Sequence, residues 1–285
     1  MVLFCFLLLS FFRQDDVKPL PDVKTFLAEF RKTLHTNNLL LSQYTYTETE
    51  THIQLDSSGK AKNKEVKIYQ VLRGPEPEDE YRRLISKDGV PVRQKDLDRQ
   101  DRERQKEMED REQKRQKKTQ AELAKMRAEK EREDDRIIDD IFAIYDIRFI
   151  GRESVDGHPA IRMSFKALSG YTPKTREGKI MQKIAGTAWV SEEDHELARI
   201  DAEVIDTISI GFGLLAKVHK GSRVSGERRK INNEVWLPSR LEVFGDVRLA
   251  MLKGLKVREI TEYSEHKKFN LETILSFPDL ENPRP

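Results

Sequence analysis

Thirteen residues from Gln43 to Leu55, QYTYTETETHIQL, alternate without a break between two sets of side chains. Tyrosine, glutamate and histidine fall on one side of an extended chain, whereas threonine, isoleucine and leucine fall on the other. A period of two in β-branched and aromatic residues predicts a β-strand. Both faces of this strand carry polar groups, so neither face is an ordinary core.

Further alternating runs follow, separated by short turn sequences. They are residues 65–73, 81–86, 145–154 and 160–167 and the runs within GTAWVSEEDHELARIDAEVID and RRKINNEVWLP. Asp-Gly and Asn-Asn between such runs favour hairpin turns, since these residues tolerate a positive φ. Hairpins that follow one another without crossover helices predict an antiparallel meander.

An amphipathic helix is expected before the first strand, over residues 22–36. Its apolar positions recur at the spacing of a single helical stripe. They are Val23, Phe26, Leu27, Phe30 and Leu34. Because such a stripe must cover an apolar surface, we expect this helix to lie on an apolar part of the protein.

A long charged segment interrupts the meander. Between Arg93 and Arg136, 44 residues contain 16 Lys/Arg and 14 Asp/Glu, with neither Gly nor Pro. Opposite charges at i and i+4, as in Glu107 and Arg111, favour a helix surrounded by solvent. The apolar positions form no sustained seam for a coiled-coil dimer. We therefore predict a single charged helix, about 66 Å long if it is fully helical and frayed in its middle, within an insertion over residues 93–140.

The chain opens with an apolar run, MVLFCFLLLSFF, that is shorter than the ~20 residues of a spanning helix but matches the core of a signal peptide. An ordinary buried element is the alternative. We expect residues 1–16 to be a signal-peptide-like leader of a periplasmic or otherwise exported protein, and residues 17–285 to form one domain. Cys5, the only cysteine, lies in the leader, so the mature chain would have no thiol.

The charge balance limits the classes of partner. Charged residues make up 36% of the chain, but 52 Lys/Arg and 50 Asp/Glu nearly cancel. A nucleic-acid-binding protein normally carries a strong excess of basic residues, so we expect no nucleic-acid partner. A hydrophobic content of 37% is enough for a core, and no membrane span is expected after the leader.

Catalytic chemistry finds little support in the residues. Glu48, Glu50 and His52 share one face of a strand, where alternate residues can supply two ligands to one metal ion. A solvated strand face explains them as well, and the sequence has no second histidine cluster. The sequence EEDHE at 192–196 lacks the spacing of a calcium loop and suits a hairpin bend. We expect no catalytic residues, no metal and no cofactor.

Several strands carry an apolar face opposite a polar one. Ile161, Met163 and Phe165 alternate with polar residues, and Trp189 and Trp236 lie within or near strands. Two interpretations remain open at this point. Either the helices close an ordinary core, or the sheet curls around an apolar groove that the helices do not fill.

Four phrases link this pattern to a known family. They are YRRLISKDGVPV, FIGRESVDGHPAIRMSF, AGTAWVSEEDHELARIDAEV and NNEVWLPSRLEVFG. Together with the leader, the amphipathic helix and the meander, they resemble the periplasmic lipoprotein carrier and acceptor LolA and LolB and the wider lipoprotein-sorting-like proteins. The resemblance implies an incomplete β-barrel with a helical lid, whose concave face holds acyl chains. The long charged insertion departs from those carriers.

The sequence thus predicts an α+β, mainly antiparallel half-barrel that binds lipid or lipoprotein acyl chains and is not an enzyme. The residues expected to line its apolar cavity are Phe26, Phe30, Tyr44, Tyr46, Ile161, Met163, Phe165, Trp189 and Trp236. The alternative is a cell-envelope scaffold that captures a protein partner through residues 93–136. A metal-dependent hydrolase using Glu50 and His52 is a third, weaker hypothesis.

Overall fold

A computed structural model describes residues 18–34, 42–73, 80–210, 216–249 and 254–268. The leader expected at 1–16 lies outside these residues. The helices of the described chain are α1 (Val23–Thr33), α3 (Gln94–Gln116), α4 (Gln120–Ile144) and α5 (Arg176–Met181). Its strands are β1 (Tyr44–Leu55), β2 (Ala61–Leu72), β3 (Tyr81–Lys87), β4 (Val90–Pro91), β5 (Tyr145–Val155), β6 (His158–Ala167), β7 (Ile184–Ser191), β8 (Leu197–Val204), β9 (Ile208–Ile210), β10 (Ala216–Val218), β11 (Arg223–Ile231), β12 (Val235–Leu249) and β13 (Leu255–Lys268).

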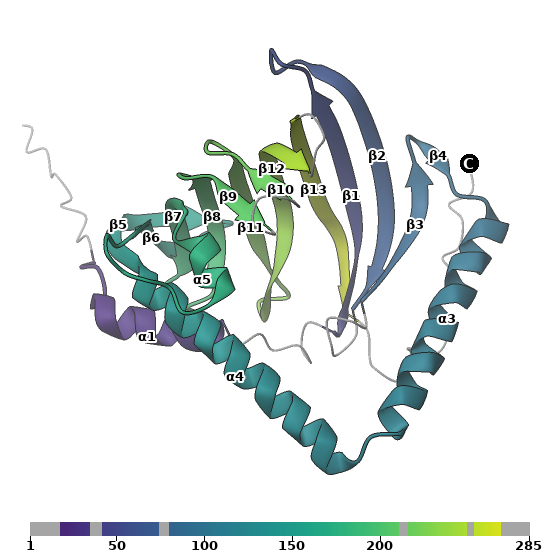
Figure 1. Cartoon of the computed structure of the whole chain (residues 1–285), viewed down its shortest axis with the longest axis horizontal. Coiled ribbons are helices and arrows are strands. Elements are labelled where there is room, and N and C mark those ends of the chain that lie inside the picture. Colours follow the sequence, from purple (N-terminus) through teal and green to yellow (C-terminus); the bar gives the residue numbers. More distant parts are fainter. Residues whose placement is uncertain (1–17, 35–41, 74–79, 211–215, 250–253, 269–285) are drawn as a thin grey trace, which may run out of the picture.

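The strands form one open, curled sheet (Figure 1). Its order is β4-β3-β2-β1-β13-β12-β11-β8-β7-β6-β5, and β9 and β10 branch from β12. All paired neighbours are antiparallel. The sheet does not close into a barrel, because β4 and β5 stay at opposite edges. The predicted fold class, α+β with an open antiparallel sheet, is therefore confirmed.

The predicted hairpin turns have the backbone that their residues favour. Asp156 and Gly157, between β5 and β6, have φ values of 50° and 82°, and Asn232 and Asn233, between β11 and β12, have 51° and 57°. Two successive positive φ angles are typical of the tight turn whose twist matches the flanking strands. The meander therefore follows from local turn chemistry as well as from the alternating pattern.

The register across the sheet separates two faces, because residues directly opposite each other in paired strands point to the same side. One row on the first face is Met163, Ala188, Ile200, Gly226, Leu241, Thr261 and Glu50. The neighbouring row on the second face is Arg162, Trp189, Arg199, Glu227, Arg240, Glu262 and Thr49. We call these the apolar face and the polar face.

Helix α1 packs on the apolar face at the β5–β8 end of the sheet. Asp22 begins the helix by accepting a hydrogen bond from the backbone N–H of Thr25 at 2.9 Å. Phe26, the buried residue of its apolar stripe, sets its ring edge-on against Phe149, with 5.5 Å between the centroids. The expected amphipathic helix is therefore present, and it covers one end of the sheet.

The charged insertion is two helices rather than the single helix predicted. Helix α3 ends at Gln116 and α4 begins at Gln120, so that the two form a V below the sheet (Figure 1). Thr119 and Glu122 form a capping box, in which each side chain bonds the backbone N–H of the other residue. The expected middle fraying is thus a defined break at 117–119. The helical part runs on to Ile144 and ends where β5 begins.

The V joins the two edges of the sheet. Helix α3 follows β4 at one edge, and α4 leads directly into β5 at the other edge. Near its start, Gln100 of α3 donates to the carbonyl of Leu84 at 3.1 Å and accepts from its N–H at 3.0 Å. An amide side chain therefore covers backbone groups of β3 that no strand pairs, which protects that edge.

Among the described residues, no helix combines the length and the apolar character needed to cross a membrane.

Candidate functional site

The candidate site is a strip of small and aliphatic residues on the apolar face, at the boundary between the part of the sheet that the helices cover and the part that they leave uncovered. Its members are Ile200, Ala202, Val224, Gly226, Leu241 and Val243, and we call them the apolar strip. Figure 1 shows α1, α5 and the end of α4 gathered at β5–β8, while β12, β13 and β1 extend away from them. Leu241 and Val243 on β12 remain partly exposed.

A glycine lies between two branched side chains of the strip. A Cβ at Gly226 would lie 3.4 Å from Ile200 and 3.8 Å from Leu241, which is ordinary contact distance. The two aliphatic side chains therefore lie close to the glycine on either side, and the strip is apolar without a break across β8, β11 and β12. Beyond β12 the row becomes polar at Thr261 and Glu50, so the strip ends at β13.

Five of the nine predicted lining residues lie at the covered end of the apolar face. They are Phe26, Phe30, Ile161, Met163 and Phe165. These side chains pack with one another and with Ile144 and Tyr145 in the largest buried cluster. Ile200 and Val224 of the strip also pack against this cluster. The five residues thus form a filled core that continues into the strip.

Tyr44 and Tyr46 lie on the same face but at the other end of the sheet. Tyr44 is fully buried with Val235 and Leu237, and its hydroxyl bonds Glu234. The ring of Tyr46 meets that of Tyr263 edge-on at 5.6 Å. The structure therefore places the two tyrosines in a second packed region, separate from the helix-covered core.

Trp189 lies on the polar face. It stands opposite Arg162 and Arg199 in the register, and the Arg199 guanidinium lies 4.8 Å from the centre of its ring. Its indole N–H donates to Glu153 at 2.7 Å. The structure therefore does not bring Trp189 together with the other predicted lining residues, since the pleat turns it to the opposite side from Met163.

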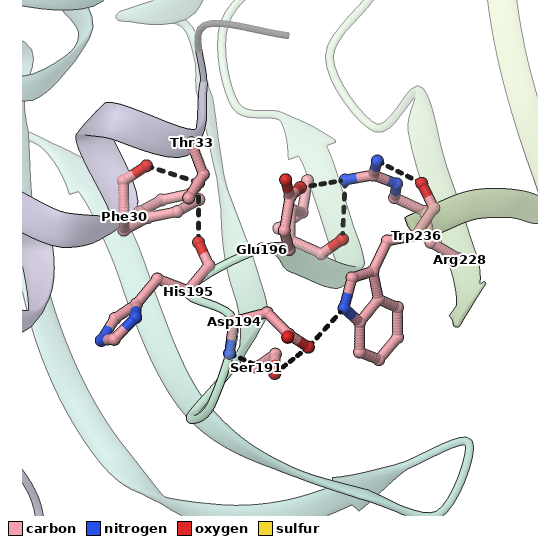
Figure 2. A network of polar contacts seen from close by, with 9 residues as sticks. Phe30, Thr33, Ser191, Asp194, His195, Glu196, Arg228 and Trp236 are labelled. Atoms are coloured by element: carbon pink, nitrogen blue, oxygen red, sulfur yellow. Dashed lines mark hydrogen bonds and ion pairs between the residues drawn. The ribbon is translucent and has the colours of Figure 1, made fainter. Parts of the chain in front are cut away.

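Trp236 belongs to a network that fixes the β7–β8 turn (Figure 2). Its indole N–H donates to Asp194 at 2.8 Å, and the Lys230 ammonium lies 2.9 Å from the other carboxylate oxygen. Burial alone raises the pKa of Asp194, but the bonds from Lys230 and Trp236 outweigh it and leave the pKa lowered. Trp236 is thus held in a polar contact rather than facing an open cavity.

The same turn binds the end of α1. Thr33 donates its hydroxyl hydrogen bond to the carbonyl of His195 at 2.7 Å or to that of Phe30 at 2.8 Å (Figure 2). His195 has a φ of 56°, and its ring lies 4.9 Å from that of Phe26. The sequence EEDHE, predicted to be a hairpin bend, therefore also anchors the helix to the sheet.

Glu48, Glu50 and His52 do not gather around a common point. Arg82 bonds both carboxylates, at 2.5 Å for Glu50, and its guanidinium lies 4.2 Å from the centre of the Tyr69 ring. Burial raises the pKa of Glu48, against the attraction of Arg82. His52 is exposed. In the described part of the chain, no three His, Cys, Asp or Glu residues come close enough to hold a metal ion.

Two pockets open outside the helix-covered core. One, of about 230 Å³, lies on the polar face beside Trp189 and Arg199. The other, of about 270 Å³, lies between α5 and β9, and we call it the α5 pocket. Its lining residues are Arg176, Lys179, Ile180, Gln182, Lys183, Ile208 and Ser209. None of these residues was singled out from the sequence, since only the folded chain brings α5 against β9.

A buried carboxylate fixes α5 in place. Asp140 of α4 is 2% exposed and accepts hydrogen bonds from Tyr171, from the backbone N–H groups of Lys174 and Thr175, and from the Thr175 hydroxyl. Burial alone raises the pKa of Asp140, but these bonds outweigh it and bring the pKa to about 2. Helix α5 and its pocket are therefore held by α4.

Comparisons with known proteins add only a likeness of structure. No family model matches the chain, and no curated protein matches it. Among solved structures, an outer membrane lipoprotein-sorting protein domain from Vibrio parahaemolyticus is 7% identical, with a TM-score of 0.32 over 87% of this chain and 94% of that one. A DUF1329 family protein from Desulfovibrio piger is 14% identical, with a TM-score of 0.30 over 86% and 92%.

A LolA superfamily protein from Nitrosomonas europaea is 13% identical, with a TM-score of 0.29 over 90% of this chain and 99% of that one. Two of the three matches thus carry the name of the lipoprotein-sorting proteins that the sequence resembles. At these TM-scores the likeness does not bear on ligand or partner. The fold class rests on the sheet itself.

Proposed function

We propose that this protein binds an apolar ligand, the acyl chains of a lipid or lipoprotein, on the apolar strip of its open sheet. One observation carries the proposal. The apolar face continues past its helical cover onto β11 and β12, where aliphatic side chains remain partly exposed. An exposed apolar surface on a curled sheet is typical of a binding site for another apolar body.

The free energy of removing hydrocarbon from water supports an acyl chain as the occupant. Each methylene group removed from water contributes about 0.8 kcal/mol, so four groups along the strip contribute about 3 kcal/mol. The unbroken apolar row of Ile200, Gly226 and Leu241 gives such a chain a surface to lie on. Binding of this kind requires no catalytic group. With the leader expected at 1–16, the proposal is of an exported, periplasmic carrier rather than an enzyme.

A charge placed on the strip tests this function. Val243→Asp puts a carboxylate on the strip, opposite Val224, and should reduce uptake of the fluorescent fatty acid cis-parinaric acid at least tenfold. Val90→Asp is the matched control, because Val90 is 67% exposed on the short edge strand β4 and lies away from the strip. Circular dichroism of both variants checks that the sheet is intact.

Equal uptake by the wild type and the folded Val243→Asp variant would contradict the strip as the site. Native mass spectrometry of the purified wild type provides a second readout, because a carrier should retain lipid from the cells that produced it. Absence of bound lipid together with absence of cis-parinaric acid uptake would reject the carrier function.

A second function, an envelope scaffold, is favoured by the surface of the V. Met108 on α3 and Met126 on α4 are each 49% exposed among charged side chains. Exposed, flexible methionines suit a protein-binding surface. If the V captures a partner, the double substitution Met108→Glu and Met126→Glu should abolish crosslinking to an envelope protein and leave fatty acid uptake unchanged. Unchanged crosslinking in this double variant would contradict the scaffold function and leave the carrier function alone.

A further inference from the structure

The α5 pocket differs from the apolar strip in its charge. Arg176, Lys179 and Lys183 contribute three cations to its lining, and no acidic residue lines it. Ile180 and Ile208 supply apolar wall between them. A pocket of about 270 Å³ with this lining offers both positive charge and apolar surface to a ligand.

Many charged side chains in the described ranges form ion pairs, but two of these cations do not. Lys183 lies 3.1 Å from the Asp206 carboxylate and donates to the carbonyl of Thr207 at 2.6 Å. Arg176 and Lys179 are exposed, and within the described ranges neither has a carboxylate partner. Cations held close together without counter-charges repel one another, and a bound anion relieves that repulsion.

The pocket is built on fixed elements. The carboxylate of Asp140 binds the segment that leads into α5, and the Thr175 hydroxyl caps the helix by accepting from the N–H of Gly178 at 2.9 Å. Lys183 stands directly before β7. The backbone that carries the three cations is therefore held in place before a ligand binds.

Two residues beside the pocket pack into the core that continues into the strip. Met181 and Ile184, which flank Lys183 on α5 and β7, pack against the buried cluster at the covered end of the apolar face. Ile200 and Val224 of the strip pack against the same cluster. Segments of the pocket and of the strip are therefore built against one cluster.

We propose that the α5 pocket binds a phosphate ester, with Arg176, Lys179 and Lys183 holding the phosphate. The three cations suit the headgroup of an anionic phospholipid whose acyl chains occupy the apolar strip, and to that extent the proposal rests on the proposed function. Guanidinium and ammonium groups form strong, charge-assisted hydrogen bonds to phosphate oxygens. The protein would then discriminate anionic from zwitterionic lipids.

Calorimetry with three probes tests the proposal on the full chain. Dihexanoyl phosphatidylglycerol carries a net negative charge, dihexanoyl phosphatidylcholine does not, and glycerol 3-phosphate has the ester without the chains. We expect phosphatidylglycerol to bind at least tenfold more tightly than phosphatidylcholine, with a preference that falls as salt is raised. Glycerol 3-phosphate binding should be weak but detectable, and a phosphate site independent of lipid would bind it as tightly as the lipid.

The double substitution Arg176→Gln and Lys179→Gln removes the unpaired cations without touching the core. It should lower phosphatidylglycerol affinity about tenfold and leave cis-parinaric acid uptake unchanged. Lys62→Gln with Lys64→Gln on the exposed strand β2 is the control and should change neither. Equal binding of the two lipids, or an unaffected double variant, overturns the phosphate site while uptake of fatty acid persists. Loss of all apolar binding in the wild type overturns the carrier function as well.

Discussion

Removal of the Asp140 carboxylate should loosen α5 and destabilise the protein. The size of the loss follows from the hydrogen bonds that this carboxylate accepts. The carboxylate is 2% exposed, and its shortest bonds are 2.7 Å to the Thr175 hydroxyl and 2.8 Å to the Thr175 N–H. Asp140→Ala leaves the N–H groups of Lys174 and Thr175 without the acceptor that they have in the folded protein. At about 1–3 kcal/mol for each group, the free energy of unfolding should fall by about 2–6 kcal/mol.

Asp140→Asn should cost less, about 1–2 kcal/mol, because its amide keeps one oxygen for the Thr175 N–H but loses the charge. Urea unfolding at pH 7, followed by circular dichroism, measures both values. The adjacent Asp139→Asn is the control, since Asp139 is 57% exposed in a surface ion pair with Arg31 and should change stability by less than about 1 kcal/mol.

The pH dependence gives a second check on Asp140. Its folded pKa of about 2 lies below the ~3.9 of an unfolded aspartate, so its contribution is complete above pH ~4 and is lost as the pH falls through about 2. The gap in unfolding free energy between the wild type and Asp140→Asn should therefore shrink between pH 4 and pH 2. Equal urea midpoints at pH 7, or a gap that widens in acid, would refute this reasoning.

Three further substitutions have defined outcomes. Gly186→Ala would place a Cβ 2.1 Å from a backbone oxygen on β8 and should destabilise by at least about 3 kcal/mol in urea, whereas Gly151→Ala, with open space around its Cβ, should be nearly neutral. Gln100→Leu removes the side chain that bonds the edge of β3, so it should cost about 1–2 kcal/mol and speed amide hydrogen exchange in β3. Unchanged exchange would contradict the protection of this edge by Gln100. Asp194→Ala leaves the buried ammonium of Lys230 with only the more distant carboxylate of Glu193, at 3.9 Å, and should cost about 3 kcal/mol. Because Trp236 also loses its acceptor, tryptophan fluorescence should shift, and an unshifted spectrum would contradict this role.

The strand pattern and the turn residues predicted the sheet because both signals are local. Alternation fixed the β1 strand within one residue of its observed bounds, and Asn232 with Asn233 gave the β11–β12 turn. The break in the charged insertion also had a local signal, the T-x-x-E spacing of Thr119 and Glu122, which is the signature of a capping box. This local signal was missed, because helix-forming residues run without a break on both sides of it.

The candidate site was harder to predict because it depends on which face each strand presents. The apolar character of Trp189 suggested a lining residue, but its register opposite Arg162 and Arg199 turns it to the polar face. Leu241 and Val243 were absent from the predicted list, although both alternate with charged residues on one strand. Their importance depends on where the helices stop covering the sheet, which is a tertiary property.

The V of α3 and α4 has a mechanical consequence, because it ties the first edge of the sheet to the last. Helices of 23 and 25 residues are stiff rods of about 35 and 38 Å, so they resist stretching along their axes. Any flattening or tightening of the sheet must therefore change the angle at residues 117–119. The insertion therefore limits how far the two edges of the sheet can move apart. A ligand that changes the curvature of the sheet should change the angle between α3 and α4 at residues 117–119, far from the ligand itself.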